Sequence, residues 1–168
     1  KNRGIVTCMT LEKSGTKKFT LFSNNYKKQI EKIDPDYCKI LVKYDPKNSK
    51  INKSNAEKVA KISSYLRKNK RKLLFEIVIL GERDFAQQIK AVKLFKKYGV
   101  KPDIWKLEAV DKKSQAKKLK ELVKNYIVLG RGASLTKAIG WLKINRKSAI
   151  GFAVGRSIFS KPLEELFN

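Results

Sequence analysis

The chain has 168 residues, the length of one domain with a real core, and we expect a single domain over 1–168. Its 40 lysines and arginines outnumber its 15 acidic residues, and the net charge of +25 is typical of proteins that bind nucleic acid or anionic surfaces. Only seven of the forty are arginines, however, and the lysines are spread over every predicted helix. Solvated helix faces explain this charge better, and a non-catalytic basic domain that binds nucleic acid or another polyanion is kept as the alternative.

The chain contains no histidine, the usual general base and the commonest metal ligand. Catalysis would therefore use lysine, acidic, tyrosine or serine side chains, and we expect no metal and no other cofactor. Cys8 and Cys38 each lie in an apolar strand-like run, which does not indicate a disulfide framework. No apolar run approaches the roughly 18 residues of a membrane span and no signal peptide opens the chain, so we expect a cytoplasmic protein without a membrane partner.

Strand-like and helix-like segments alternate along the chain. Ser54 and Glu57 have the spacing of a capping box and start the clearest predicted helix. Gly99 provides a left-handed helix end, and Pro162 starts a short closing helix. The predicted strands are 5–11, 37–44, 73–80, 102–110, 126–129 and 149–154, and the helices between them are 24–33, 54–69, 84–98, 112–124 and 134–142.

This alternation predicts an α/β fold with parallel strands and right-handed crossovers. A doubly wound sheet and a (β/α)₈ barrel both fit. No G-x-G-x-x-G motif follows the first strand, which argues against a dinucleotide-binding sheet.

The strand around Lys106 carries charge inside an otherwise apolar run. Because alternate residues of a strand share a face, Lys106 and Glu108 lie on one side, and Trp105 and Leu107 on the other. Burial disfavours the charged form of a lysine, and the neutral amine is a nucleophile. The alternative is a surface lysine on an edge strand, paired with a carboxylate.

In barrels and open α/β sheets the active site lies at the carboxyl ends of the strands. The two glycine-arginine turns at the last two strand ends are typical of phosphate binding, because glycine lets backbone N–H groups approach an oxyanion. We expect Lys13, Lys39 and Lys106 to converge on one pocket, with Glu76 between Lys39 and Lys106. We expect Lys43 to reach solvent at the rim, and the same position is the alternative for Lys13. The candidate residues at these ends are Lys13, Lys39, Lys43, Glu76, Lys106, Gly130, Arg131, Gly132, Gly155 and Arg156.

Six ordered motifs give the chain a specific resemblance over nearly its whole length. The chain resembles the 2-deoxy-5-keto-gluconate-6-phosphate aldolase domain of myo-inositol catabolism. That domain is similar in turn to the class I tagatose-1,6-bisphosphate aldolases, which are (β/α)₈ barrels. The segments that carry the resemblance are 11–15, 34–46, 72–76, 102–108, 128–132 and 150–156.

The resemblance implies roles for individual residues. Lys106 matches the Schiff-base lysine, Glu76 a proton-handling glutamate, and Lys39 the lysine beside the amine. Arg156 and the turn at Gly130 match the phosphate-binding end of the barrel. The implied reaction cleaves a phosphorylated keto-sugar acid to dihydroxyacetone phosphate and malonate semialdehyde, without a metal.

The resemblance also places the six strands as the third to the eighth of a barrel. The family's first two strands, one of which carries an acidic residue, have no counterpart here. We expect an upstream segment or a second chain to complete the barrel, because open sheet edges promote association. The other expected partner is a small phosphorylated sugar.

Overall fold

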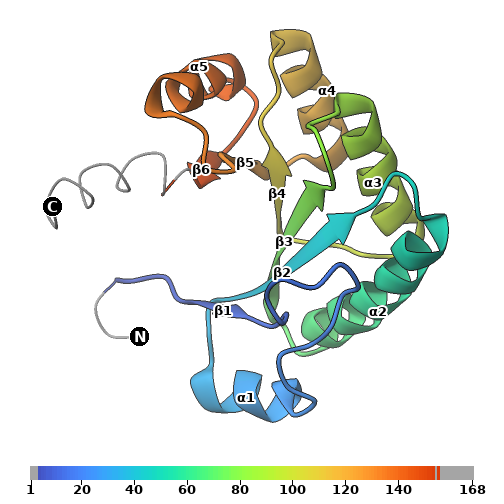
Figure 1. Cartoon of the computed structure of the whole chain (residues 1–168). Helices are drawn as coiled ribbons and strands as arrows, with labels where there is room; N and C mark the ends of the chain where they lie inside the picture. Colours follow the sequence, from blue (N-terminus) through green and yellow to red (C-terminus); the bar gives the residue numbers. More distant parts are fainter. Residues whose placement is uncertain (1–3, 154, 156–168) are drawn as a thin grey trace, which may run out of the picture. The chain divides into compact units, whose positions relative to one another are not determined.

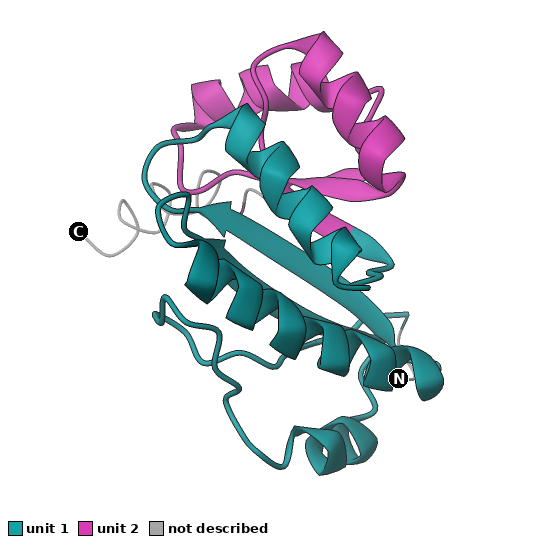
Figure 2. Ribbon diagram, turned by 90° about the vertical axis from the view of Figure 1, so that its right-hand side faces the viewer, with its two compact units in different colours: residues 1–104 teal, residues 105–168 magenta. Residues whose placement is uncertain are grey.

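A computed structural model of the chain describes residues 4–153 and 155. The chain forms two compact units, residues 1–104 and 105–168, which Figure 2 shows in different colours. Each unit is built from parallel strands that alternate with helices. The described helices include none that is long and apolar enough to cross a membrane.

The first unit contains three strands in the order β1-β2-β3, all parallel (Figure 1). The second unit contains β4, apart from its first residue, with β5 and β6, again parallel and in sequential order. In the first unit the elements are β1 (Cys8–Thr10), α1 (Tyr26–Ile33), β2 (Tyr37–Tyr44), α2 (Ser49–Lys68), β3 (Lys72–Ile79) and α3 (Phe85–Lys97). They are followed by β4 (Ile104–Glu108), α4 (Lys113–Val123), β5 (Tyr126–Leu129), α5 (Leu135–Asn145) and β6 (Gly151–Ala153).

The predicted fold class is confirmed: the chain is α/β, and its described residues form six parallel strands with five alternating helices, as in part of a (β/α)₈ barrel. Antiparallel pairing between consecutive strands would have contradicted it. Within each unit the order follows the sequence, as in a barrel, where each strand pairs with the next one along the chain.

The core of the first unit lies between its strands and helices α2 and α3. Ile40 and Val42 of β2 are buried on one face of the sheet, as the period of two in a strand requires. On β3, Phe75 packs edge-on against Phe95 of α3, with ring centroids 4.8 Å apart. Val59 and Leu66 of α2 are fully buried and lie seven residues apart, so they mark the inward face of this helix.

Helix α2 begins earlier than the sequence pattern indicated. The capping box at Ser54 and Glu57 is wrong, because the side chain of Asn48 accepts a hydrogen bond from Ile51 N and starts the helix there. The end of the next helix is confirmed: Gly99 has a φ of 83° just after α3.

The two terminal strands are shorter than predicted. β1 covers three residues of the predicted 5–11, although Leu11 N still donates to Lys39 O at 2.9 Å. β6 ends at Ala153, and the helix predicted at Pro162 lies outside the described residues.

Candidate active site

The first unit holds a buried cluster of three charged side chains. Lys39 Nζ of β2 donates a hydrogen bond to Glu12 Oε1 and lies 3.5 Å from Glu76 Oε2 of β3. The exposed fractions of the three side chains are 17% for Lys39, 7% for Glu12 and 5% for Glu76. The Lys39 ammonium group offsets part of the negative charge of the two buried carboxylates, since buried charges require such pairing.

The strand register explains why these residues meet. Thr10 of β1 pairs with Lys39, so Glu12 follows just beyond the end of β1 and beside the next residues of β2. Leu41 pairs with Glu76, and Leu41 shares a face with Lys39 because they are two residues apart. Lys39 and Glu76 therefore project from the same face of the sheet.

One carboxylate oxygen of this cluster is available for another donor. Glu12 Oε2 is buried and has no hydrogen-bond partner among the described residues. A buried oxygen without a partner costs free energy, and a bound hydroxyl group or water molecule would remove that cost.

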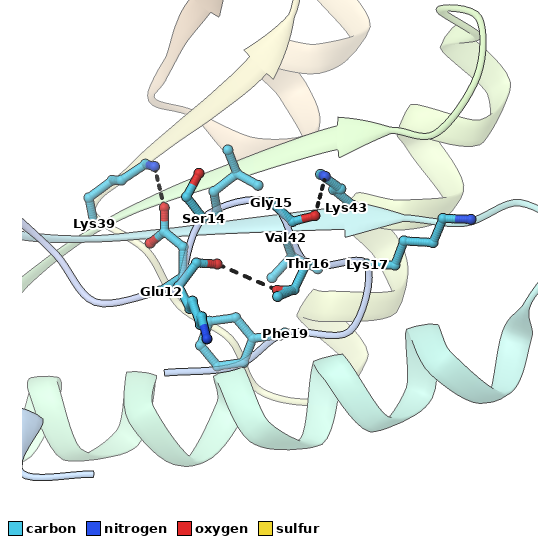
Figure 3. Close-up of a pocket in the computed structure, with 11 residues that line it drawn as sticks. Glu12, Ser14, Gly15, Thr16, Lys17, Phe19, Lys39, Val42 and Lys43 are labelled. Carbon is cyan, nitrogen blue, oxygen red and sulfur yellow. Dashed lines mark hydrogen bonds and ion pairs between the residues drawn. The ribbon is translucent and has the colours of Figure 1, made fainter. Parts of the chain in front are cut away.

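A cavity of about 250 Å³ opens beside the cluster, between the loop after β1 and strand β2 (Figure 3). Glu12 and Lys39 line it together with Lys13 and Lys43. Of the lysines predicted to converge, Lys13 and Lys39 thus line one cavity. Lys43 was expected to reach solvent, but it is half-buried and donates to the carbonyl oxygen of Gly15 at 3.2 Å.

The loop that walls this cavity is anchored at its base. Lys13 N donates to Thr20 O at 2.8 Å, and Phe19 is buried with its backbone N–H donating to Asn55 Oδ1 of α2. Gly15 has a φ of 85°, which a side chain at this position would strain.

The thiol of Cys38 lies next to the cluster in sequence but is not a reactive group of the site. Cys38 precedes Lys39 on β2 and is buried on the opposite face. Burial raises the pKa of the Cys38 thiol to about 11, and the electrostatic effect of Cys8 acts in the same direction. Because the thiolate is the reactive form, Cys38 is a core residue at neutral pH.

In the second unit, β4 has the alternation that the sequence indicated. Trp105 and Leu107 are buried, whereas Lys106 is half-buried. Glu108, on the same side as Lys106, is 2% exposed and accepts a hydrogen bond from Arg131 Nη1 at 2.8 Å. Lys106 belongs to the second unit, so its approach to Lys39 and Glu76 of the first unit stays a prediction.

The turn after β5 has the backbone of a tight loop. Arg131 and Gly132 have φ values of 51° and 73°. The contact with Glu108 gives Arg131 a structural role that the sequence did not indicate, and phosphate binding at Gly130, Arg131 and Gly132 stays a prediction. Gly155 is exposed, and Arg156 lies outside the described residues.

Sequence reasoning missed Glu12. The signal was present, since Glu12 directly follows a predicted strand end, as Lys13 does, and Lys39 was already a candidate. The described residues contain no group of three or more His, Cys, Asp and Glu side chains that could hold a metal ion.

The comparisons with known proteins agree with this fold. A family model described as "Uncharacterized protein conserved in bacteria (DUF2090)" matches residues 10–167. No curated protein sequence gives a significant match.

Two solved structures resemble the chain in fold. One, described as a Schiff base forming fructose-1,6-bisphosphate aldolase, has a TM-score of 0.71 and 12% sequence identity, over 99% of this chain and 73% of that one. The other, Cgl0159 from Corynebacterium glutamicum, has a TM-score of 0.68 and 11% identity, over 88% of this chain. The chain spans 55% of the length of Cgl0159.

Proposed function

The chain belongs to the DUF2090 family, and we propose that it is a class I aldolase, or part of one, that cleaves a phosphorylated keto-sugar through a Schiff base. The observation that carries the proposal is the buried cluster of Lys39, Glu12 and Glu76 beside a lysine-lined cavity. The fold shared with a Schiff-base-forming aldolase supports it.

The nucleophile in this proposal is Lys106. Its neutral amine adds to the ketone carbon of the substrate, and the resulting carbinolamine loses water to form an iminium ion. Because the iminium nitrogen accepts an electron pair, the bond between the α and β carbons can break while a base removes the proton of the β-hydroxyl group. An aldehyde leaves, the enamine is protonated on carbon, and water releases the second product and the free lysine.

Proton transfer falls to the carboxylates of the cluster. Glu76 is the base in this proposal, and Glu12, through its oxygen without a partner, orients a substrate hydroxyl group. Lys39 holds the two carboxylates in place and places an ammonium group where negative charge develops.

The preferred substrate in this proposal is 2-deoxy-5-keto-gluconate 6-phosphate, which is cleaved to dihydroxyacetone phosphate and malonate semialdehyde in inositol catabolism in the cytoplasm. Lys13 on the cavity wall and the turn of Gly130, Arg131 and Gly132 are the proposed anion contacts. Gly155 and Arg156 would extend the phosphate site. An upstream segment or a second chain would complete the barrel around it.

Borohydride trapping tests the mechanism. We expect incubation with dihydroxyacetone phosphate and borohydride to leave a covalent adduct on Lys106, located by peptide mass spectrometry. Lys106→Arg should abolish the adduct. Lys72→Arg is the matched control, because Lys72 is an exposed lysine at the amino end of strand β3.

Two outcomes would reject the proposal. An adduct that persists in Lys106→Arg would assign the chemistry to another lysine. Absence of any adduct in the unsubstituted protein would reject the Schiff-base mechanism and leave the non-catalytic basic domain as the alternative.

A further inference from the structure

A second cation-rich hollow lies in the second unit, between α4 and the segment that links α5 to β6. It has a volume of about 440 Å³ and is lined by six basic residues together with Ile144 and Ser148. We call it the α4–α5 groove. Its basic residues are Lys113, Lys117, Lys120, Lys143, Arg146 and Lys147.

The sequence explains how the cations converge. Lys113, Lys117 and Lys120 are spaced four and three residues apart, so they form one stripe along α4. The end of α5 adds Lys143, and the turn that follows adds the other two basic residues. Lys120 Nζ donates to Lys147 O at 3.2 Å, which fixes the turn against the helix.

The charge in the α4–α5 groove is uncompensated. None of its six basic residues forms an ion pair with a carboxylate of the described chain, and no acidic residue lines the groove. Like charges one helical turn apart repel each other, so the arrangement costs stability unless an anion is bound.

Another basic hollow of the chain is different. In the first unit, Arg67, Lys70, Arg71 and two more lysines surround a hollow of about 320 Å³, but Asp103 lines it as well. Arg71 is also bonded to Asp34. A basic hollow of this chain can therefore include an acidic residue, and the α4–α5 groove differs because it includes none.

We propose that the α4–α5 groove binds an anion with several linked phosphate groups. Lysine ammonium groups bind phosphate as point charges, and three of them in a row along α4 span about 10 Å, which fits linked phosphates better than a single one. No aromatic side chain is among the described residues that line the groove, so it offers no stacking platform for bases. The ligand is therefore recognised through its phosphates, whether free or in a nucleic-acid backbone.

The test uses tripolyphosphate as the probe and calorimetric titration of the full chain at two salt concentrations. We expect saturable binding at low salt that weakens as salt rises. The variant Lys113→Gln/Lys117→Gln/Lys143→Gln should bind about tenfold more weakly, because three charge contacts with the phosphate groups are lost. Lys120 is left in place because it supports the turn.

The control variant removes the same charge elsewhere. Lys53→Gln/Lys61→Gln/Lys93→Gln changes three exposed helix lysines that do not line the α4–α5 groove, and we expect less than a roughly twofold change. The triple Lys→Arg variant at the three groove positions keeps the charge and should keep the binding. Circular dichroism checks that all variants are folded.

Equal weakening in the groove variant and the control, or no binding to the unsubstituted protein at low salt, would overturn the proposal. Competition then separates the sources of phosphate. If a single-stranded oligonucleotide displaces tripolyphosphate at a lower concentration than nucleoside triphosphates do, the groove binds a nucleic-acid backbone. If only nucleoside triphosphates displace it, the groove binds free polyphosphates. Either result supports the site.

Discussion

Removing the lysine from the buried cluster should destabilise the first unit strongly. Lys39→Met keeps the length and apolar stem of the side chain but deletes the ammonium group that lies against Glu12 and Glu76. Both buried carboxylates then lose the ammonium group of Lys39. Loss of one partner from a buried ion pair is costly, since the remaining charge keeps its desolvation cost and loses its attraction.

The structure sets the size of this effect. Such losses are typically 3–5 kcal/mol, and we expect about 3 kcal/mol, at the low end, because Lys39 keeps some solvent contact and its contact with Glu76 is long. With a slope of about 2 kcal/mol per molar urea, the unfolding midpoint should fall by about 1.5 M. Adding Glu12→Gln to Lys39→Met should restore about 1–2 kcal/mol, since one buried charge disappears.

Urea unfolding followed by circular dichroism measures these changes. Lys43→Met is the matched control, because Lys43 lies on the same strand and face but donates only to a carbonyl oxygen. Its cost should stay near 1 kcal/mol or below. If Lys39→Met and Lys43→Met shift the midpoint equally, or if Glu12→Gln fails to restore stability in the double variant, the cluster is not held by mutual charge balance.

Two further predictions concern buried groups with raised pKa values. Iodoacetamide should label exposed Cys8 in the native protein and Cys38 only after unfolding, and rapid native labelling of Cys38 would contradict its burial. The stability that the protein gains from the neutral, buried Cys38 thiol should persist below pH 9 and be lost as the pH rises toward 11. Burial also raises the pKa of Tyr126 to about 12, and its hydroxyl group donates to Asn145 Oδ1 at 3.0 Å. Tyr126→Phe should therefore lower the free energy of unfolding by about 1–3 kcal/mol in thermal or urea melts, and an unchanged stability would show that this hydrogen bond is dispensable.

Strands with local boundaries were predictable from the sequence. β2 and β5 have the predicted ends, since turn-forming residues bound each apolar run: Asp-Pro pairs on either side of β2, and Asn125 and Gly130 at the ends of β5. The start of α2 was not predictable from the sequence, because two capping patterns compete there. Ser54 with Glu57 matches the stronger pattern, but Asn48 lies six residues earlier and its cap adds more than a turn of helix.

Partners in the candidate site depend on neighbours that are distant in sequence. Lys39 and Glu76 could be selected because each is a charge inside an apolar strand. Glu12 could have been a candidate from its place after a strand end, but its burial beside Lys39 follows from the register of β1 against β2. Likewise, the bond from Arg131 to Glu108, 23 residues earlier, could not be foreseen from the sequence.

The anchoring of the loop after β1 has a consequence for how the cavity can change. Its base is held by backbone pairing between Lys13 and Thr20, and Phe19 is tied to Asn55 of α2. The tip between these anchors is largely exposed and carries little of the core. New tip sequences could therefore reshape the cavity wall while the sheet beneath stays intact, so the loop is a place where ligand preference can diverge, or be engineered, at small cost to folding.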